Sequence, residues 1–201
     1  MSDLPMTKGE ETYRKIINGA IDIMAEEGVS GLSASKVALK SGVSKSDLVH
    51  HFKTIEEVPI AVLDTLIKDV MAPMTHMKAD SVEMMFNSLE SMLNWRTEVD
   101  PRTNKVFYAF YYAGMFDEAY KEVMHSFLEA SKEDLACKIM NVSVREVKKS
   151  EAERYATLMM AMLDGIGLHI LLGVNKEHYL NSWRLLKQVM VRELDYYEDW
   201  R

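Results

Sequence analysis

Residues 33–52 read SASKVALKSGVSKSDLVHHF, and this stretch decides the fold. Its apolar residues recur at the spacing that two short helices need when they pack against each other. Gly42 stands between the two halves, where the chain needs a permissive backbone to turn. A serine precedes each half and can cap the helix that follows it. The stretch therefore predicts two short helices, over residues 34–41 and 45–51, joined by a tight turn.

The side chains of this helix pair divide into an inner and an outer set. The inner positions, which can pack against each other and against a preceding helix, are Val37, Ala38, Val43, Leu48 and Phe52. The second helix directs Lys45, Ser46, Val49 and His50 away from that core. Asp47 follows Ser44 by three residues and completes the pattern of a capping box. This arrangement predicts a helix-turn-helix with an outward face on its second helix.

Charge is distributed unevenly along the chain. The net charge is −7 and the pI is about 5.4, which argues against a protein that coats nucleic acid non-specifically. Residues 33–53, however, hold four lysines against Asp47 alone, a local balance of +3. From charge alone, a solvated lysine face is an equally good interpretation. Together with the core pattern and the turn, the lysines favour binding to DNA phosphates.

The remainder of the chain is typical of an all-α protein. Hydrophobic residues make up 48% of the 201 residues, and only 9 Gly and 4 Pro interrupt them. We expect about nine helices, with Pro73 ending or bending the fourth and a break near Gly114. The chain shows no long apolar run, no signal segment and one cysteine, Cys137. These features predict a cytoplasmic protein without a membrane span.

From Thr12 to about Val58 the chain resembles the TetR family of transcriptional regulators. The matching residues of the first helix are Thr12, Ile16, Ala20, Ala25, Glu26 and Gly28. Further matches are Val37, Ala38, Gly42, Val43, Ser44, Leu48, Phe52 and Glu56. The resemblance implies a helix-turn-helix DNA-binding domain at 1–55 and a helical ligand-binding and dimerisation domain at 56–201. It also implies a homodimer that commonly represses transcription until a small-molecule inducer releases it.

The sequence departs from the family pattern at the second helix of the motif. The family usually has Gly-Thr where this chain has Ser46-Asp47, often Tyr at Val49, and commonly a phosphate-binding Lys at Ile55. Loss of the tyrosine and lysine should weaken phosphate contacts. A carboxylate near DNA is repelled, so we interpret Asp47 as a helix cap. Val49 can instead pack on a thymine methyl group.

The predicted DNA contacts follow from placing the second helix in the major groove of an operator duplex. Candidate base contacts are Lys45, Ser46, Val49 and His50. The other candidate DNA-binding residues, chiefly facing phosphates, are Ser33, Ser35, Lys36, Ser44, His51 and Lys53. The two helix-turn-helix domains of a dimer would bind half-sites roughly 34–36 Å apart, which predicts a near-palindromic operator. The adjacent histidines are poor metal ligands because neighbouring helical residues point about 100° apart.

Aromatic and methionine residues concentrate in the middle of the chain and are candidates for an inducer pocket. They are Met92, Trp95, Phe107, Tyr108, Phe110, Tyr111, Tyr112, Met115, Phe116, Met124 and Phe127. For any one of them, ordinary core packing is the simpler interpretation, and only the cluster favours a pocket. The family resemblance supports the pocket, because the family places its inducer site in this region.

Residues 158–173, LMMAMLDGIGLHILLG, carry Asp164 and His169 in an otherwise apolar segment. The segment is similar to the Asp-Gly-containing eighth helix of the choline-responsive branch of the family. That similarity implies a cationic ligand held by aromatic faces, with Asp164 as its counter-ion. A structural hydrogen bond or a polar pair at the dimer interface is the simpler role for Asp164. For His169, a satisfied core or interface histidine is the simpler role.

The two C-terminal helical segments, 151–173 and 177–198, carry apolar stripes too extensive for one partner face. By resemblance to the family they form a four-helix bundle between two subunits, and exposed faces of this size favour association. The candidate interface residues are Tyr155, Met159, Met162, Ile166, His169, Ile170, Trp183, Leu186, Met190 and Leu194.

Two other classes of protein are alternatives to a DNA-binding regulator. An enzyme is disfavoured, because the sequence shows no catalytic constellation, metal-ligand spacing or glycine-rich phosphate loop, and we predict no cofactor. A ligand-binding or interaction protein of the same fold, with weak or lost DNA binding, remains the alternative. The residues Asp47, Val49 and Ile55 keep that alternative open.

Overall fold

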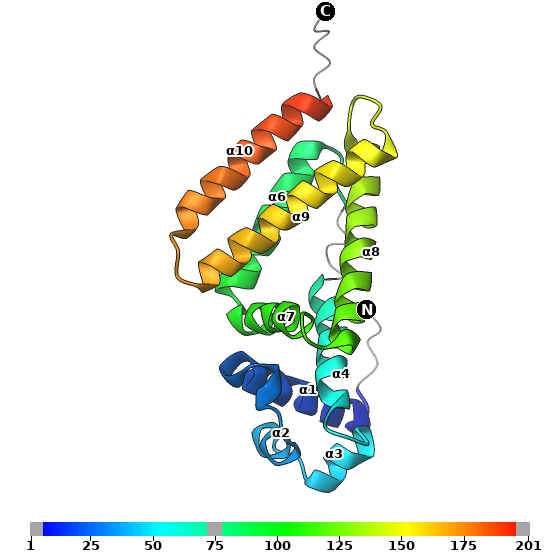
Figure 1. Cartoon of the computed structure of the whole chain (residues 1–201), viewed down its shortest axis with the longest axis vertical. Coiled ribbons are helices and arrows are strands. Elements are labelled where there is room, and N and C mark those ends of the chain that lie inside the picture. Colours follow the sequence, from blue (N-terminus) through cyan, green and yellow to red (C-terminus); the bar gives the residue numbers. More distant parts are fainter. Residues whose placement is uncertain (1–5, 72–77, 196–201) are drawn as a thin grey trace, which may run out of the picture. The chain divides into compact units, whose positions relative to one another are not determined.

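The computed structural model describes residues 6–71 and 78–195, and within them the chain forms nine α-helices and no strand (Figure 1). The predicted all-α class is confirmed. None of the described helices is both long and apolar enough to cross a membrane. The chain forms two compact units: the first combines residues up to Val70 with Lys105–Glu122, and the second combines Met71–Asn104 with residues from Val123 onward. The functional boundary predicted between residues 55 and 56 stays a prediction.

The first unit contains the helix-turn-helix. Its elements are α1 (Lys8–Glu27), a short 3₁₀ turn (Val29–Gly31), α2 (Ala34–Ser41), α3 (Lys45–His51), α4 (Glu57–Thr65) with a π-helical continuation (Leu66–Met71), and most of α7 (Pro101–Ala113). The two predicted short helices are confirmed with the predicted bounds. The predicted effect of Pro73 lies outside the described residues.

The core of the first unit forms where α1 packs on α2, α3 and α4. Apolar residues recur along α1 at helical spacing, so one stripe of that helix is buried. The predicted inner residues are buried with it, except Val43, which is partly exposed. The buried set is Ile16, Ile17, Ala20, Ile21, Met24, Val37, Ala38, Leu48, Phe52, Val58, Val62 and Leu63.

The turn between α2 and α3 depends on the backbone of Gly42. Its φ of 66° and ψ of 29° lie in the left-handed region, where other residues are strained. The N–H of Gly42 donates to the carbonyl of Leu39 at 3.3 Å, and the N–H of Val43 donates to that of Ala38 at 3.1 Å. These bonds satisfy the last carbonyls of α2 and start α3 at a fixed angle.

The crossing of α1 and α2 is close because α1 carries Gly19. A Cβ at this position would lie 2.3 Å from Ser41 Oγ and 3.0 Å from the backbone nitrogen of Ser41. The two helix backbones therefore touch at this point without an intervening side chain. The orientation of α2, and with it that of α3, depends on the missing side chain.

The second unit is built from α6 (Val82–Glu98), most of α8 (Glu118–Val142), α9 (Lys149–Leu171) and α10 (Lys176–Asp195). Its core surrounds Trp183, which is fully buried and lies 4.8 Å, centroid to centroid, from Phe86. The predicted break near Gly114 is confirmed, because α7 ends at Ala113 and α8 begins at Glu118. The last residues predicted for the final helix, 196–198, lie outside the described residues.

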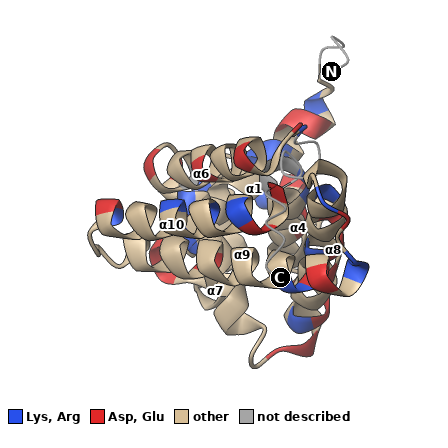
Figure 2. Ribbon diagram, turned by 90° about the horizontal axis from the view of Figure 1, so that it is seen from above, with Lys and Arg blue, Asp and Glu red and all other residues tan. Residues whose placement is uncertain are grey.

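Lys and Arg positions occur along α10, which lies next to α6 (Figure 2). Ion pairs connect the two helices: Arg184 pairs with Glu90 at 2.9 Å, and Lys176 pairs with Glu98 at 2.5 Å. The side chain of Glu90 is 16% exposed, whereas that of Glu98 is 64% exposed. An exposed pair contributes roughly 0–1 kcal/mol, so the buried apolar stripe of α10 contributes more to holding the helix in place than these pairs do.

The end of α10 is held by Arg145 from the loop before α9. The Arg145 Nε donates to the carbonyl of Glu193 at 2.7 Å, and its backbone N–H donates to that of Leu194 at 3.3 Å. The guanidinium also pairs with Glu151 and holds the pKa of that carboxyl below its usual value. Two carbonyls in the last described turn of α10 therefore have a partner outside that helix.

We expect Gly19→Ala to destabilise the first unit by about 1–3 kcal/mol, because the new methyl group overpacks the contact with Ser41. Gly9→Ala is the matched control in the same helix, since its Cβ would meet only Thr7 Oγ1 at 4.0 Å. Urea unfolding of both variants measures the effect. Equal stability of the Gly19 variant and the wild type would contradict the close approach.

Candidate nucleic-acid interface

The start of α3 is fixed by a capping box, as the sequence predicts. The Asp47 N–H donates to Ser44 Oγ at 3.0 Å, while the backbone N–H of Ser44 donates to Asp47 Oδ2 at 3.1 Å. The hydroxyl of Ser44 also donates to Asp47 Oδ2 at 2.7 Å. Asp47 is therefore occupied within the first turn of its own helix. This geometry supports its interpretation as a cap and orders a helix of only seven residues.

The same contacts set the ionisation of Asp47. The hydroxyl and the backbone N–H of Ser44 hold the pKa of its carboxyl below the usual value, with smaller contributions from Lys8 and His51. A lowered pKa means that the folded state favours the charged form. The cap is therefore complete above the ordinary titration range of aspartate and is lost as the pH falls through the lowered pKa.

The outward side of α3 carries the predicted base contacts. Lys45, Ser46 and His50 are exposed, and the side chain of Val49 is 63% exposed although it is apolar. Leu48, on the opposite side, is 3% exposed and joins the core. The structure thus gathers the four predicted residues on one accessible face. Their contact with bases stays a prediction.

The lysines of α2 are paired with glutamates from the end of α1. Lys36 Nζ lies 2.5 Å from Glu27 Oε2 and donates to the carbonyl of Gly31 at 3.2 Å. Lys40 Nζ lies 3.1 Å from Glu26 Oε1. Two of the four positive charges counted in the sequence are therefore compensated by a neighbouring helix. The local excess of +3 that is counted along the sequence is therefore not a free basic patch in the folded structure.

The end of α3 rests against α1. The ring of Tyr13 lies 5.7 Å from that of Phe52, nearly parallel, and 6.1 Å from that of His51. His51 is consequently half-buried, whereas His50 is exposed and its ring stands at 81° to that of His51. His51 can present one edge to a ligand, and Tyr13 holds it in position.

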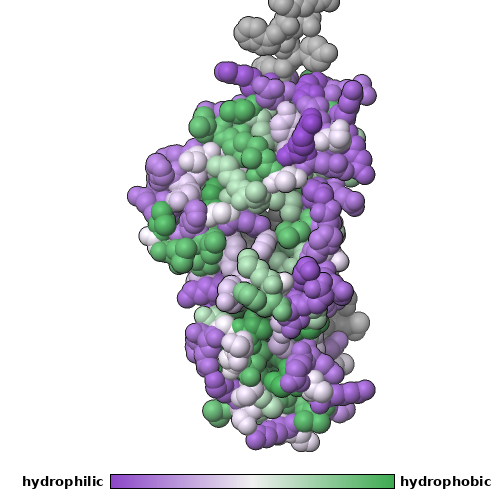
Figure 3. Space-filling view, in the orientation of Figure 1, coloured by the Kyte–Doolittle hydropathy of each residue, from purple (hydrophilic) through white to green (hydrophobic). Residues whose placement is uncertain are grey.

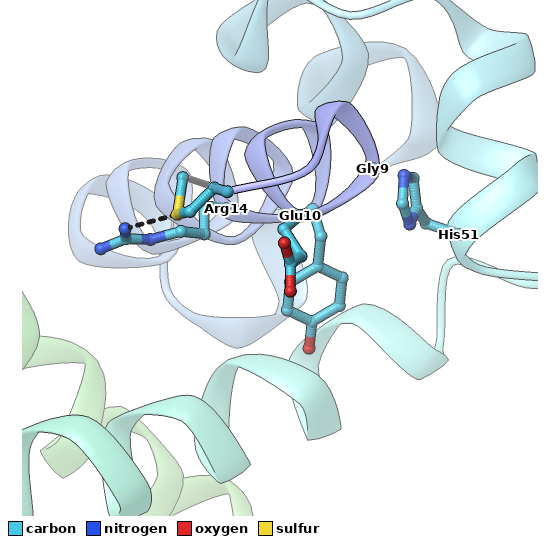
Figure 4. A pocket seen from close by; sticks show the side chains of 6 residues that line it. Gly9, Glu10, Arg14 and His51 are labelled. Carbon is cyan, nitrogen blue, oxygen red and sulfur yellow. Dashed lines mark hydrogen bonds between the residues drawn. The ribbon is translucent and has the colours of Figure 1, made fainter. Parts of the chain in front are cut away.

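A groove of about 430 Å³ opens beside this contact (Figure 4). It is lined by the first turns of α1 and by His51 from α3, and Glu10 points into it between Arg14 and His51. Lys8, the first residue of α1, is exposed and close enough to α3 to lower the pKa of Asp47. Sequence analysis missed Lys8, because it lies 37 positions before Lys45 and no local pattern relates the two.

The other predicted phosphate contacts lie at helix ends of the same unit. The Oγ of Ser33 accepts a hydrogen bond from the Lys36 N–H at 3.3 Å and caps α2, as predicted. Ser35 and Lys53 are exposed. The backbone N–H of Lys53 donates to Glu57 Oε2 at 3.0 Å.

The predicted ligand residues of the first unit fall into a buried, a half-buried and an exposed group. Phe107 and Phe110 are buried, and Phe110 packs on Tyr120 with a centroid distance of 5.5 Å. Tyr108 and Tyr111 are half-buried and contact Phe107. The exposed group is Tyr112 (67%), Met115 (73%) and Phe116 (76%). Such exposure does not fit an enclosed cavity within one chain.

The remaining predicted ligand residues belong to the second unit. Met124 is 5% exposed, Trp95 is 44% exposed, and Met92, Phe127 and Asp164 are intermediate. No described geometry assigns these side chains to a ligand. Their role in binding an inducer stays a prediction.

Half of the predicted dimer residues are enclosed in the core of the second unit. Met159, Ile166, Trp183, Met190 and Leu194 are each at most 2% exposed. These five residues are therefore removed from the predicted interface, because a second copy cannot contact side chains that their own chain covers. The other five are partly buried: Tyr155, Met162, His169, Ile170 and Leu186.

A different set of apolar residues lies along α9, its C-cap and α10, and all of them are exposed except Gly165, which is partly buried. On α9 the set alternates spacings of three and four residues, the pattern of one helix face. Figure 3 shows hydrophobic side chains gathered on the side that carries these helices. We call this set the α9–α10 face, and it comprises Leu158, Ala161, Gly165, Leu168, Leu172, Leu185 and Val189.

The fold and the outward face of α3 define an all-helical protein with an N-terminal helix-turn-helix. Residues 16–62 match the family model described as bacterial regulatory proteins, tetR family. No curated protein sequence matches the chain. The chain is therefore similar to the TetR family over residues 16–62, and as a whole it has the fold of solved TetR-family transcriptional regulators.

Solved structures of similar proteins share this fold over nearly the whole chain. A transcriptional regulator from Rhodococcus sp. Rha1 has a TM-score of 0.77 and 23% identity, covering 96% of this chain and 100% of its own. A TetR transcription regulator from Haloarcula marismortui has a TM-score of 0.74 and 16% identity, covering 92% and 98%. A Saccharomonospora viridis protein in complex with choline has a TM-score of 0.71 and 16% identity, covering 92% and 96%.

We expect Ser44→Ala to lower the free energy of unfolding by about 1 kcal/mol, because the start of α3 loses its cap. Ser46→Ala, in the same helix, is the matched control, since Ser46 lies on the outward face. Denaturant unfolding at several pH values measures both. The difference between the Ser44 variant and the wild type should shrink as the pH falls through the lowered pKa of Asp47. A constant difference across that range would show that Asp47 is not the partner.

Proposed function

We propose that the protein is a ligand-responsive transcriptional regulator that binds a near-palindromic operator as a homodimer. The observation that carries this proposal is the exposed face of α3. Lys45, Ser46, Val49 and His50 project from a short helix whose start is capped and whose angle is set by Gly42. Such a helix fits the major groove, where hydrogen-bonding and apolar side chains distinguish base pairs.

Val49 indicates which base lies opposite the middle of α3. An isolated apolar side chain that is 63% exposed gains nothing from water, but it can pack against the methyl group of thymine. Lys45 can donate to the acceptors of guanine or to a phosphate. The proposed half-site therefore contains a thymine opposite the middle of α3.

Dimerisation is supported by the α9–α10 face. Leu172 is 71% exposed and Leu185 is 61% exposed, and a water-exposed stripe of this length favours burial against a second copy. Gly165 lies within the stripe, and a Cβ there would meet no atom within 4 Å in the single chain. A partner helix can approach closely at such a position.

Ligand response is proposed for the helical body, residues 56–201. The choline complex of the similar Saccharomonospora viridis protein supports a small organic molecule as the ligand. A ligand that binds better to the conformation unable to engage DNA lowers operator affinity by mass action. On this proposal, the response requires different affinities for the two states and no covalent chemistry.

Val49→Ala should lower affinity for a site selected from random duplexes by about tenfold, the loss of one base contact. It should leave non-specific DNA binding unchanged, because Val49 carries no charge. Fluorescence anisotropy at fixed salt measures both affinities. Val144→Ala, at another exposed valine, is the control.

Two results would contradict this assignment. Failure of the wild type to select any sequence would favour an interaction protein of the same fold without operator binding. Equal losses on selected and random duplexes in the Val49 variant would place this side chain outside base recognition.

Leu158→Glu combined with Leu185→Glu should raise the dimer dissociation constant at least about tenfold, because two charges would have to be buried in the interface. Leu39→Glu is the control, since Leu39 is 85% exposed on α2, outside the α9–α10 face. Sedimentation equilibrium measures the dissociation constants. An unaffected dimer in the double variant would place the interface on another surface, and a monomeric wild type would overturn dimerisation itself.

A further inference from the structure

The lysines of the first unit differ in whether a carboxylate compensates them. Lys36 and Lys40 are paired with Glu27 and Glu26. Lys8 and Lys45 are exposed and have no ion pair within the described part of the chain. Residues 6–53 carry seven Lys or Arg and six Asp or Glu, so this segment is nearly neutral as a whole. Which lysines contact DNA therefore depends on pairing rather than on their number.

Lys8 is brought to the DNA-binding helix by the contact between α1 and α3. Tyr13 stacks on the Phe52 ring at the end of α3, and this fixes the first turns of α1 beside that end. Gly9 and His51 line the same groove from its two sides (Figure 4). Lys8 immediately precedes Gly9. Its charge also contributes to the lowered pKa of Asp47 in the first turn of α3.

Helix stability does not account for a lysine at this position. Lys8 is the first residue of α1, and a cation in the first turn of a helix opposes the helix dipole. The start of α1 is secured by Thr7 and Glu10, which form a capping box without Lys8. The ammonium group is therefore available to an external anion.

We propose that Lys8 contacts a phosphate of the operator backbone beside α3, and that Lys36 and Lys40 do not contact phosphates. This inference rests on the proposed function, because it divides the lysines of one DNA-binding surface. Lys36 and Lys40 instead hold α2 against the end of α1. The phosphate contacts then come from the unpaired lysines near α3, which include a residue of the first helix.

The salt dependence of DNA binding distinguishes the two groups of lysines. Each lysine that neutralises a phosphate releases a counter-ion, so log K falls against log salt concentration with a slope of about −0.9 per contact. A lysine that stays paired with a glutamate releases none. Removing a lysine–glutamate pair together keeps the net charge of the protein constant and separates local contact from general attraction.

The test compares three double variants of the full-length protein, each with unchanged net charge. Lys8→Gln with Glu11→Gln should reduce the magnitude of the slope by about 0.9. Lys36→Gln with Glu27→Gln, and Lys40→Gln with Glu26→Gln, should leave it unchanged. Glu11 serves as the partner substitution because it is exposed and its side chain lies outside the capping box. Titration of a random duplex at four salt concentrations gives the slopes.

Lys45→Gln is the reference variant, since Lys45 belongs to the proposed function. If it reduces the slope and the Lys8 double variant does not, the inference about Lys8 is overturned while the proposed function stands. If either pair deletion in α2 reduces the slope, the paired lysines contact phosphate and the division is overturned. If neither the wild type nor any variant binds DNA, both proposals fail. Thermal unfolding of each variant checks that the first unit is still folded and that the capping box of α1 is intact.

Discussion

The left-handed turn at Gly42 is the constraint on which the outward face of α3, the candidate DNA-binding face, depends. It ends α2, satisfies the final carbonyls of that helix and sends the chain into α3 at one angle. The helix that follows has only seven residues and is too short to be stable alone, so its position comes from its neighbours. The capping box at Ser44 and the burial of Leu48 complete the constraint.

Tertiary packing then adds a second helix to this surface. Because Gly19 removes the side chain at the crossing of α1 and α2, the two backbones meet directly. Tyr13 stacks on Phe52 at the other end of α1. With two fixed points along its length, α1 presents its first turn beside α3, and a segment far away in sequence becomes part of the same face.

Folding decides which lysines of the helix-turn-helix segment carry an uncompensated charge, as well as the shape of that segment. The four lysines of residues 33–53 suggest a basic patch when counted along the chain. In the structure, two of them face the carboxylates of Glu26 and Glu27, which precede them by 14 and 9 residues. Exposed ion pairs of this kind are individually weak, but each removes a charge from the set that is free to meet a phosphate. On the proposed function, a nearly neutral helix-turn-helix segment would favour selective over non-specific DNA binding, since non-specific binding is mainly electrostatic.

The sequence by itself determined the elements whose signals are local. These include the bounds of α2 and α3, the cap at Ser44, the turn at Gly42 and the outward position of Val49. Apolar periodicity also predicted nine helices, but it did not distinguish core from interface on α9 and α10. Trp183 and Leu185 show the reason: both are large and apolar, and only the packed structure covers one and leaves the other exposed. Tertiary structure alone decided the pairing of Lys36 and Lys40 and the approach of Lys8 to α3, because electrostatic partners are chosen by distance in space and not by order along the chain.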